Sequence, residues 1–212
     1  MAVAVQINAA DLTVKVAEAA PPKELAESIR KLLVGKAVQL VNNDQPVFEF
    51  WFNSQTPLTA KPDSELKPFA SLKEGTLLGA VAVHGDLRDY RDDELREGAY
   101  TLRFGLQPQD GNHLGTAEFP FFALLVPAKV DTKPDTMTTY KSLVKASSAD
   151  TTSDHPRILS LRPVTGTEAG DLPKLNNPLP DHKTVRLRLP AVAGEAKTSI
   201  VLELVYEGRG HK

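Results

Sequence analysis

Several ingredients of common functional sites are missing from this sequence. Its 212 residues include no cysteine, which excludes disulfide frameworks, thiol nucleophiles, zinc ribbons and thiol redox motifs. No apolar run approaches the ~20 residues that cross a bilayer as a helix, so membrane insertion is not expected. The 25 basic and 27 acidic side chains give a formal net charge of −2, and no long-range field draws the chain to nucleic acid. Nucleic-acid partners are therefore not expected.

Recognisable catalytic patterns are missing as well. The chain contains no G-x-S-x-G elbow, no H-E-x-x-H, no glycine-rich phosphate loop and no dinucleotide fingerprint. Ser153, Asp154 and His155 are neighbours in the sequence, but a catalytic triad is assembled in space from distant segments. The sequence therefore favours a noncatalytic protein, and a hydrolase with an unrecognised site is an alternative.

Alternation of apolar and polar residues runs through the chain from end to end. This period of two is typical of strands that are half buried against a core. About nine strands are predicted, at 12–19, 35–43, 46–54, 76–85, 98–108, 119–127, 157–164, 183–190 and 198–208. Loops are expected at 145–156 and 165–183, which are rich in Ser, Thr, Asp, Asn, Gly and Pro.

Two segments have the spacing of helices. Near 22–33, a proline pair opens a run with acidic residues early, basic residues late and leucine or isoleucine at helical spacing. Near 136–146, Met137, Tyr140 and Leu143 fall on one stripe. Because no βαβ alternation appears, the chain is predicted to be mainly β, an antiparallel β-sandwich of about nine strands with two helical insertions in a single domain, 1–212.

The strand phases predict one core and one register. The expected core residues are Phe48, Phe50, Phe52, Leu102, Phe104, Phe122, Leu124, Leu187, Leu202 and Leu204. In the C-terminal hairpin, Leu187 should lie opposite Leu202, because a register slip of one residue would expose one row of apolar side chains to water. Arg186 then faces Glu203 on the outer face, where an exposed ion pair stabilises little.

The stretch from His84 to His113 raises the question of a metal or catalytic site. Segments 76–85 and 98–108 read as the arms of a hairpin, which places His84 on the same sheet face as Arg103. The acidic residues between the arms alternate with arginines, which indicates a solvated loop with local ion pairs. Their spacing does not match an EF-hand calcium loop. A strand-end histidine facing solvent is the expected role of His84.

A polar turn supplies the candidate ligand-binding residues. Asp110-Gly111 is a turn signal that would present the next two side chains at a tip, where binding residues often lie. The candidates are Gln107, Gln109, Asp110, Asn112 and His113. The alternative is a copper- or zinc-binding module that uses His84, His113 and His155, since imidazole and carboxylate groups suit both metals. Apart from such a metal ion, no cofactor is expected.

Two longer stretches, "LREGAYTLRFGLQPQDGNHLG" followed by "FFALLVPA", and "APPKELAESIRKLL" with the later "GKAVQLVNNDQPVFEFWF", carry a resemblance. They look like uncharacterised exported proteins of planctomycete-like bacteria, which usually carry a signal peptide. The resemblance implies a periplasmic or secreted protein and supplies no catalytic residues. The first twelve residues lack the basic and long apolar regions of a signal peptide, so either a leader was removed or the protein is cytosolic.

These observations predict a noncatalytic β-sandwich that binds an unknown protein partner or a small ligand outside the cytoplasm. The metal-binding module and the hydrolase are the two alternatives.

Overall fold

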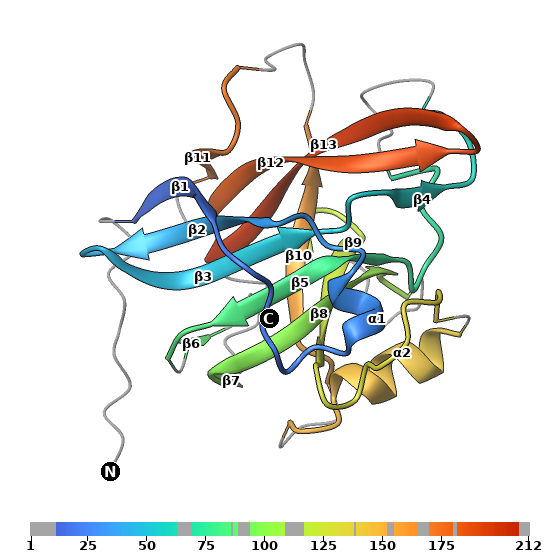
Figure 1. Cartoon of the computed structure of the whole chain (residues 1–212), viewed down its shortest axis with the longest axis horizontal. Coiled ribbons are helices and arrows are strands. Elements are labelled where there is room, and N and C mark those ends of the chain that lie inside the picture. Colours follow the sequence, from blue (N-terminus) through green and yellow to red (C-terminus); the bar gives the residue numbers. More distant parts are fainter. Residues whose placement is uncertain are drawn as a thin grey trace.

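A computed structural model describes residues 12–62, 69–85, 87–88, 94–108, 117–137, 139–151, 155–164, 170–179 and 182–207 of the chain (Figure 1). Within them lie two helices, α1 (Glu27–Arg30) and α2 (Tyr140–Ser147). The strands are β1 (Thr13–Glu18), β2 (Lys36–Asn42), β3 (Gln45–Phe52), β4 (Thr56–Leu58), β5 (Leu77–Val83), β6 (Leu87–Arg88), β7 (Glu94–Leu95), β8 (Gly98–Leu106), β9 (Phe121–Pro127), β10 (Ile158–Pro163), β11 (Lys174–Leu179), β12 (His182–Ala193) and β13 (Ala196–Glu207).

One sheet dominates the molecule. Its strands follow the order β1-β2-β3-β5-β8-β9-β10-β13-β12-β11, every neighbouring pair in this order is antiparallel, and β4 joins β12 in parallel. The sheet curls until its first strand, β1, approaches its last, β11 (Figure 1). The mainly β, antiparallel prediction is confirmed, but the strands form one nearly closed barrel and not the two stacked sheets of the expected sandwich. Alternation shows that a strand has a buried face without showing which strands lie across the core from it.

Irregular pairings help the sheet to curl. The register shifts within the β2–β3 pair, the β5–β8 pair and the β12–β13 pair, and such bulges increase local twist. Gly79 lies at the β5–β8 irregularity, and a Cβ atom on this residue would lie 2.3 Å from the carbonyl oxygen of Trp51. Only glycine therefore allows β3 and β5 to approach so closely at this point.

The barrel interior is filled by apolar side chains. Phe48, Phe50 and Phe52 of β3 stack in a row, with ring centroids 5.7 and 6.3 Å apart. All ten predicted core residues are buried. Eight of them share this interior, but Phe122 and Leu124 belong to a separate cluster beneath α2, so the expectation of a single core is wrong for these two.

The two helices lie against the outside of the barrel (Figure 1). An apolar cluster lies beneath each of them. Under α1, Ile29 packs with Trp51 and Ala80, and the indole Nε1 donates to the carbonyl oxygen of Ala19 at 2.8 Å. Under α2, Leu143 packs with the two apolar side chains of β9 named above. Central strands are therefore covered on both faces, as the nearly continuous apolar sequence of β3 suggests.

Both helices differ in length from their predictions. The first, expected near 22–33, is helical only at Glu27–Arg30, because the chain after it turns to bond the end of β3. Val34 donates to the carbonyl of Phe52, and Ser54 donates to the carbonyl of Leu32. The second, expected near 136–146, begins after Thr139, whose side chain accepts from the backbone N–H of Ser142 at 3.1 Å and so caps the helix.

All nine predicted strands are present, and four more were not predicted. β4, β6 and β7 are only two or three residues long, too short to show a period. β11 lies in a segment predicted as a loop, because its Asn and Pro residues conceal the alternation. It forms as an edge strand on β12, where a proline is tolerated.

The predicted register of the C-terminal hairpin is confirmed. Leu187 pairs with Leu202, Val185 with Leu204 and Leu189 with Ile200, and all six side chains are buried in the barrel interior. Arg186 lies opposite Glu203 on the outer face. The hairpin of β5 and β8 also forms as predicted.

Replacing Leu102 by alanine should strongly destabilise the fold. The side chain is 1% exposed, and truncation of a buried leucine costs about 2–5 kcal/mol through lost burial and a residual cavity. The matched surface variant is His84→Ala, whose side chain is 43% exposed and which should melt close to the wild type. Thermal unfolding followed by circular dichroism measures both, and equal melting temperatures for Leu102→Ala and the wild type would contradict the placement of β8.

Candidate functional site

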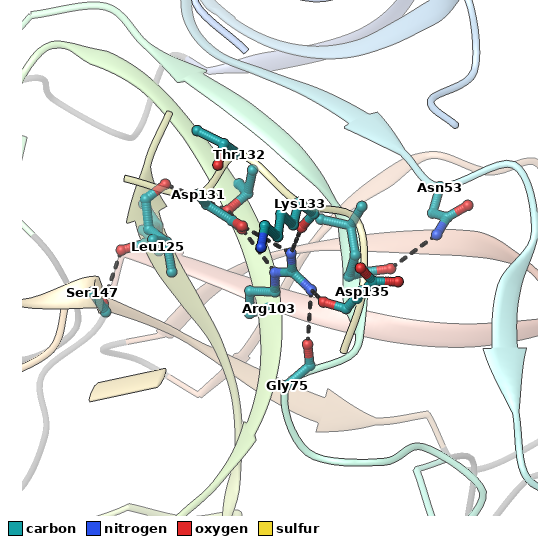
Figure 2. Close-up of polar contacts among 12 residues, drawn as sticks. Asn53, Gly75, Arg103, Leu125, Asp131, Thr132, Lys133, Asp135 and Ser147 are labelled. Atoms are coloured by element: carbon teal, nitrogen blue, oxygen red, sulfur yellow. Dashed lines mark hydrogen bonds and ion pairs between the residues drawn. The ribbon is translucent and has the colours of Figure 1, made fainter. Parts of the chain in front are cut away.

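A buried ion pair organises the outer face of β8 (Figure 2). The guanidinium of Arg103 donates from Nε and Nη2 to the two carboxylate oxygens of Asp131, at 2.8 and 2.9 Å. The side chains are 0% and 2% exposed. Thr101, two residues earlier on the same strand face, donates its hydroxyl to the same carboxylate. Because the carboxylate is held by both strand residues, the pair is satisfied in a place that water does not reach.

The same guanidinium also binds three carbonyl oxygens. It donates to Gly75 at 3.0 Å, to Asp135 at 2.7 Å and to Lys133 at 2.5 Å (Figure 2). Gly75 has a φ of +80°, and a Cβ atom there would lie 2.0 Å from the carbonyl oxygen of Met137. Through these hydrogen bonds, Arg103 holds the segment after β9 and the turn before β5 against the barrel wall. The role is structural, since all five N–H donors of the guanidinium are taken up by these oxygens.

A second buried arginine fastens the chain around α2. Arg157, 2% exposed, pairs with Asp150 and stands over the ring of Tyr100 at 5.7 Å. Next to it, the Ser147 hydroxyl lies 2.8 Å from the carbonyl oxygen of Leu125 (Figure 2) and 3.1 Å from that of Arg157. The end of α2 is thus held against β9 and β10.

A third group of charges lies on the outer face of the C-terminal strands and is partly open to solvent. Cross-strand pairing sets Lys174 of β11 opposite Arg186 of β12, Arg186 opposite Glu203 of β13, and Glu203 opposite Arg162 of β10. We call this row of four side chains the charged row. Neighbouring strands lie ~4.8 Å apart, so the row crosses about 14 Å of the barrel wall.

Glu203 is the centre of the charged row. One of its carboxylate oxygens accepts from Arg186 Nε and Nη2 at 3.0 and 2.8 Å and from Asn176 Nδ2 at 2.8 Å. Its other oxygen lies 3.6 Å from Arg162 Nε. The Glu203 side chain is only 5% exposed, so the expectation of an exposed, weak pair with Arg186 is wrong. Period-two reasoning places Glu203 on the outer face but does not show that long side chains from both neighbouring strands cover it.

The charged row adjoins the base of the connection between β8 and β9. Arg162 pairs with Glu118, and its guanidinium stands 5.2 Å from the centre of the Phe119 ring. Gln107, at the other side of the same connection, donates its backbone N–H to the carbonyl of Pro120 at 2.8 Å. The described base of this connection, which includes Gln107, therefore lies beside the charged row.

Of the candidate ligand-binding residues, Gln107 is described and partly buried at this base. Gln109, Asp110, Asn112 and His113 lie outside the described residues, so they stay a prediction.

The metal site predicted at His84, His113 and His155 stays a prediction. His84 Nε2 lies 2.8 Å from Glu49 Oε2, and the other oxygen of Glu49 accepts from Gln39 at 2.6 Å. His155 is exposed before β10, which two intervening strands separate from β5, or about 14 Å of strand spacing. His113 lies outside the described residues. Across the described ranges, no three acidic or histidine side chains converge as metal ligands.

Burial changes the titration of one group in the barrel. It raises the pKa of Tyr206 from 10.0 to about 12, with a smaller contribution from the charge of Glu207. The unfolded chain then loses this proton before the folded chain does, so Tyr206 lowers stability as the pH rises through this window. At the surface, hydrogen bonds to Glu18 and Glu94 raise the pKa values of Lys36 and Arg96.

Comparison with known proteins does not identify a family for this chain, so a functional assignment depends on the contacts described above. No family model, no curated protein and no solved structure matches the chain. Neither helix in the described part of the chain is long and apolar enough to cross a membrane.

Replacing Arg103 by methionine should lower the free energy of unfolding by about 3–5 kcal/mol, because the Asp131 carboxylate would stay buried without its counter-charge. The control is Lys31→Met, which removes a cation paired with Glu27 at 2.8 Å while both side chains are about 70% exposed. Urea denaturation measures both variants. Equal midpoints for the two would show that the buried pair contributes no more than a surface pair.

Glu203→Gln should also destabilise the protein, by about 1–3 kcal/mol, since the change removes the shared counter-charge of two arginines from a buried position. Glu207→Gln on the same strand is the matched control, because its carboxylate is 48% exposed and pairs only with Lys183 among the described ion pairs. Thermal melts compare the two. A Glu203→Gln protein that melts with the control would contradict the central role of this carboxylate.

Proposed function

We propose that the protein is a noncatalytic binding module, and that its ligand or partner docks on the outer face of β10, β13, β12 and β11. The observation that carries the proposal is the charged row, in which a buried carboxylate holds two arginines in place on an accessible face. The side chains of Arg162 and Arg186 are 14% and 18% exposed. Such preorganised groups bind a partner at little entropic cost.

The other charged groups favour a binding role over a catalytic one. Arg103 and Arg157 are buried, and their N–H groups donate to carboxylate and carbonyl oxygens of the chain itself. His84, which could act as a base, is directed toward Glu49 on a different part of the wall. Among the described hydrogen bonds, none joins the His84 ring to a serine or threonine hydroxyl that could act as a nucleophile.

We propose that the predicted turn with Gln107, Gln109, Asp110, Asn112 and His113 belongs to the same binding surface, since the described base of this connection adjoins Arg162 through Glu118 and Phe119. We further propose that the module works outside the cytoplasm, in the periplasm or as a secreted protein. The resemblance to exported proteins supports this location.

The proposal is tested by a thermal-shift screen of the purified chain against small organic molecules and soluble polymers. At least one compound should raise the melting temperature, because a ligand that binds only the folded state stabilises it. The double variant Gln107→Ala, His113→Ala should weaken that shift, and His84→Ala should leave it unchanged.

Two results would contradict the proposal. Turnover of an ester, phosphoester or glycoside substrate would favour the hydrolase alternative. Stoichiometric copper or zinc in elemental analysis that is lost on His113→Ala would favour the metal-binding module.

A further inference from the structure

The outer face of the C-terminal hairpin carries more cations than the charged row alone. The core-facing residues of β13 are Ile200, Leu202 and Leu204, so the alternation directs Ser199 and Lys197 to the outer face. Arg188 Nη1 lies 3.2 Å from Ser199 Oγ, which places Arg188 on that face too. Lys174, Arg188 and Lys197 are all exposed.

Carboxylates on this face are already engaged by arginine. Glu203 is bound by Arg186 and Arg162, and Glu118 is bound by Arg162. Lys183 and Glu207 pair with each other on the same face. With them, the six cations Arg162, Lys174, Lys183, Arg186, Arg188 and Lys197 exceed the three carboxylates Glu118, Glu203 and Glu207. The described part of this face is therefore basic although the whole chain carries a net charge of −2. A local basic face on a weakly acidic protein selects ligands by contact and not by long-range attraction.

The geometry points to a ligand with regularly repeated negative groups. Lys174 and Arg186 lie on neighbouring strands, and Arg162 lies two strands beyond Arg186 with Glu203 between them. The cations are therefore separated by one and by two multiples of the ~4.8 Å distance between strands. That distance is close to the length of one sugar residue in a polysaccharide. Guanidinium groups bind carboxylate and sulfate through paired hydrogen bonds, and the amide of Asn176 can bind a hydroxyl.

An aromatic ring lies beside these groups. Phe119 is partly exposed and stands under the Arg162 guanidinium at 5.2 Å. The guanidinium covers one face of this ring, and the exposed part of the ring, next to fixed polar donors, suits the apolar face of a sugar ring.

We propose that the basic face binds an acidic polysaccharide, a chain of sugars that carry carboxylate or sulfate groups, laid across strands β11, β12, β13 and β10. This inference rests on the proposed binding function and names its ligand class. The strand ladder sets the spacing of the cations, and Glu203 keeps the central pair of arginines oriented.

The test is isothermal titration of the purified full chain with heparin, which is sulfated, and with polygalacturonate, which carries only carboxylates. Dextran is the neutral control polymer and a DNA duplex is the polyanion control. At least one acidic polysaccharide should bind with an affinity that falls as salt rises, and dextran and the duplex should not bind comparably.

The matched variants carry three lysine or arginine to alanine changes each. Lys174→Ala, Arg188→Ala, Lys197→Ala removes the exposed cations of the basic face, while Lys23→Ala, Lys31→Ala, Lys36→Ala removes three exposed lysines elsewhere and changes the net charge equally. The first should lose affinity by about tenfold to a hundredfold and the second should bind as the wild type does. Both should keep near-native melting temperatures, because none of the six side chains is buried.

Equal loss in the two triple variants, or DNA binding as tight as polysaccharide binding, would overturn the assignment in favour of a general polyanion effect. Absence of binding to both acidic polysaccharides would overturn it as well. If another compound in the thermal-shift screen still binds, only the ligand class fails and the binding function stands. If nothing in that screen binds, the proposed function fails with it.

Discussion

The buried pair of Arg103 and Asp131 is the interaction on which much of the outer structure depends. A guanidinium removed from water must have every donor satisfied, and here the carboxylate and three carbonyl oxygens do so. Those carbonyls belong to the turn before β5 and the segment after β9. The requirement to satisfy one charge thus determines where two long connections lie on the barrel wall.

Other arginines around the barrel are also held by carboxylates, and they differ in how much of the side chain is exposed to solvent. Arg157 is buried and holds the residues around α2, whereas Arg162 and Arg186 share one buried carboxylate and keep part of their surface in solvent. A buried charge whose donors are all satisfied by the chain, such as that of Arg103, holds the chain together. Charges that are fixed by a buried partner and still open to solvent can also meet a ligand, which is why the charged row carries the proposed function.

Local sequence was sufficient for nine of the thirteen described strands and for one register. In the β12–β13 hairpin the apolar row with Leu187 and Leu202 has a single alignment that keeps both partners out of water, so pattern alone predicts it. β11 escaped prediction because Asn and Pro conceal its alternation, and α1 is shorter than its helical spacing suggests because the following residues hydrogen bond to β3. Tertiary hydrogen bonds overrode local preference in both places.

The sequence by itself determined which residues face a core, because alternation is a local property of each strand. Only the tertiary structure decided that the strands roll into one barrel, that Phe122 lies under a helix and not in the interior, and that Glu203 is buried. These outcomes depend on which distant segments meet. The candidate site follows the same division: the turn at Gln107 was visible as a local signal, whereas the charged row exists only because β10, β11, β12 and β13 lie side by side.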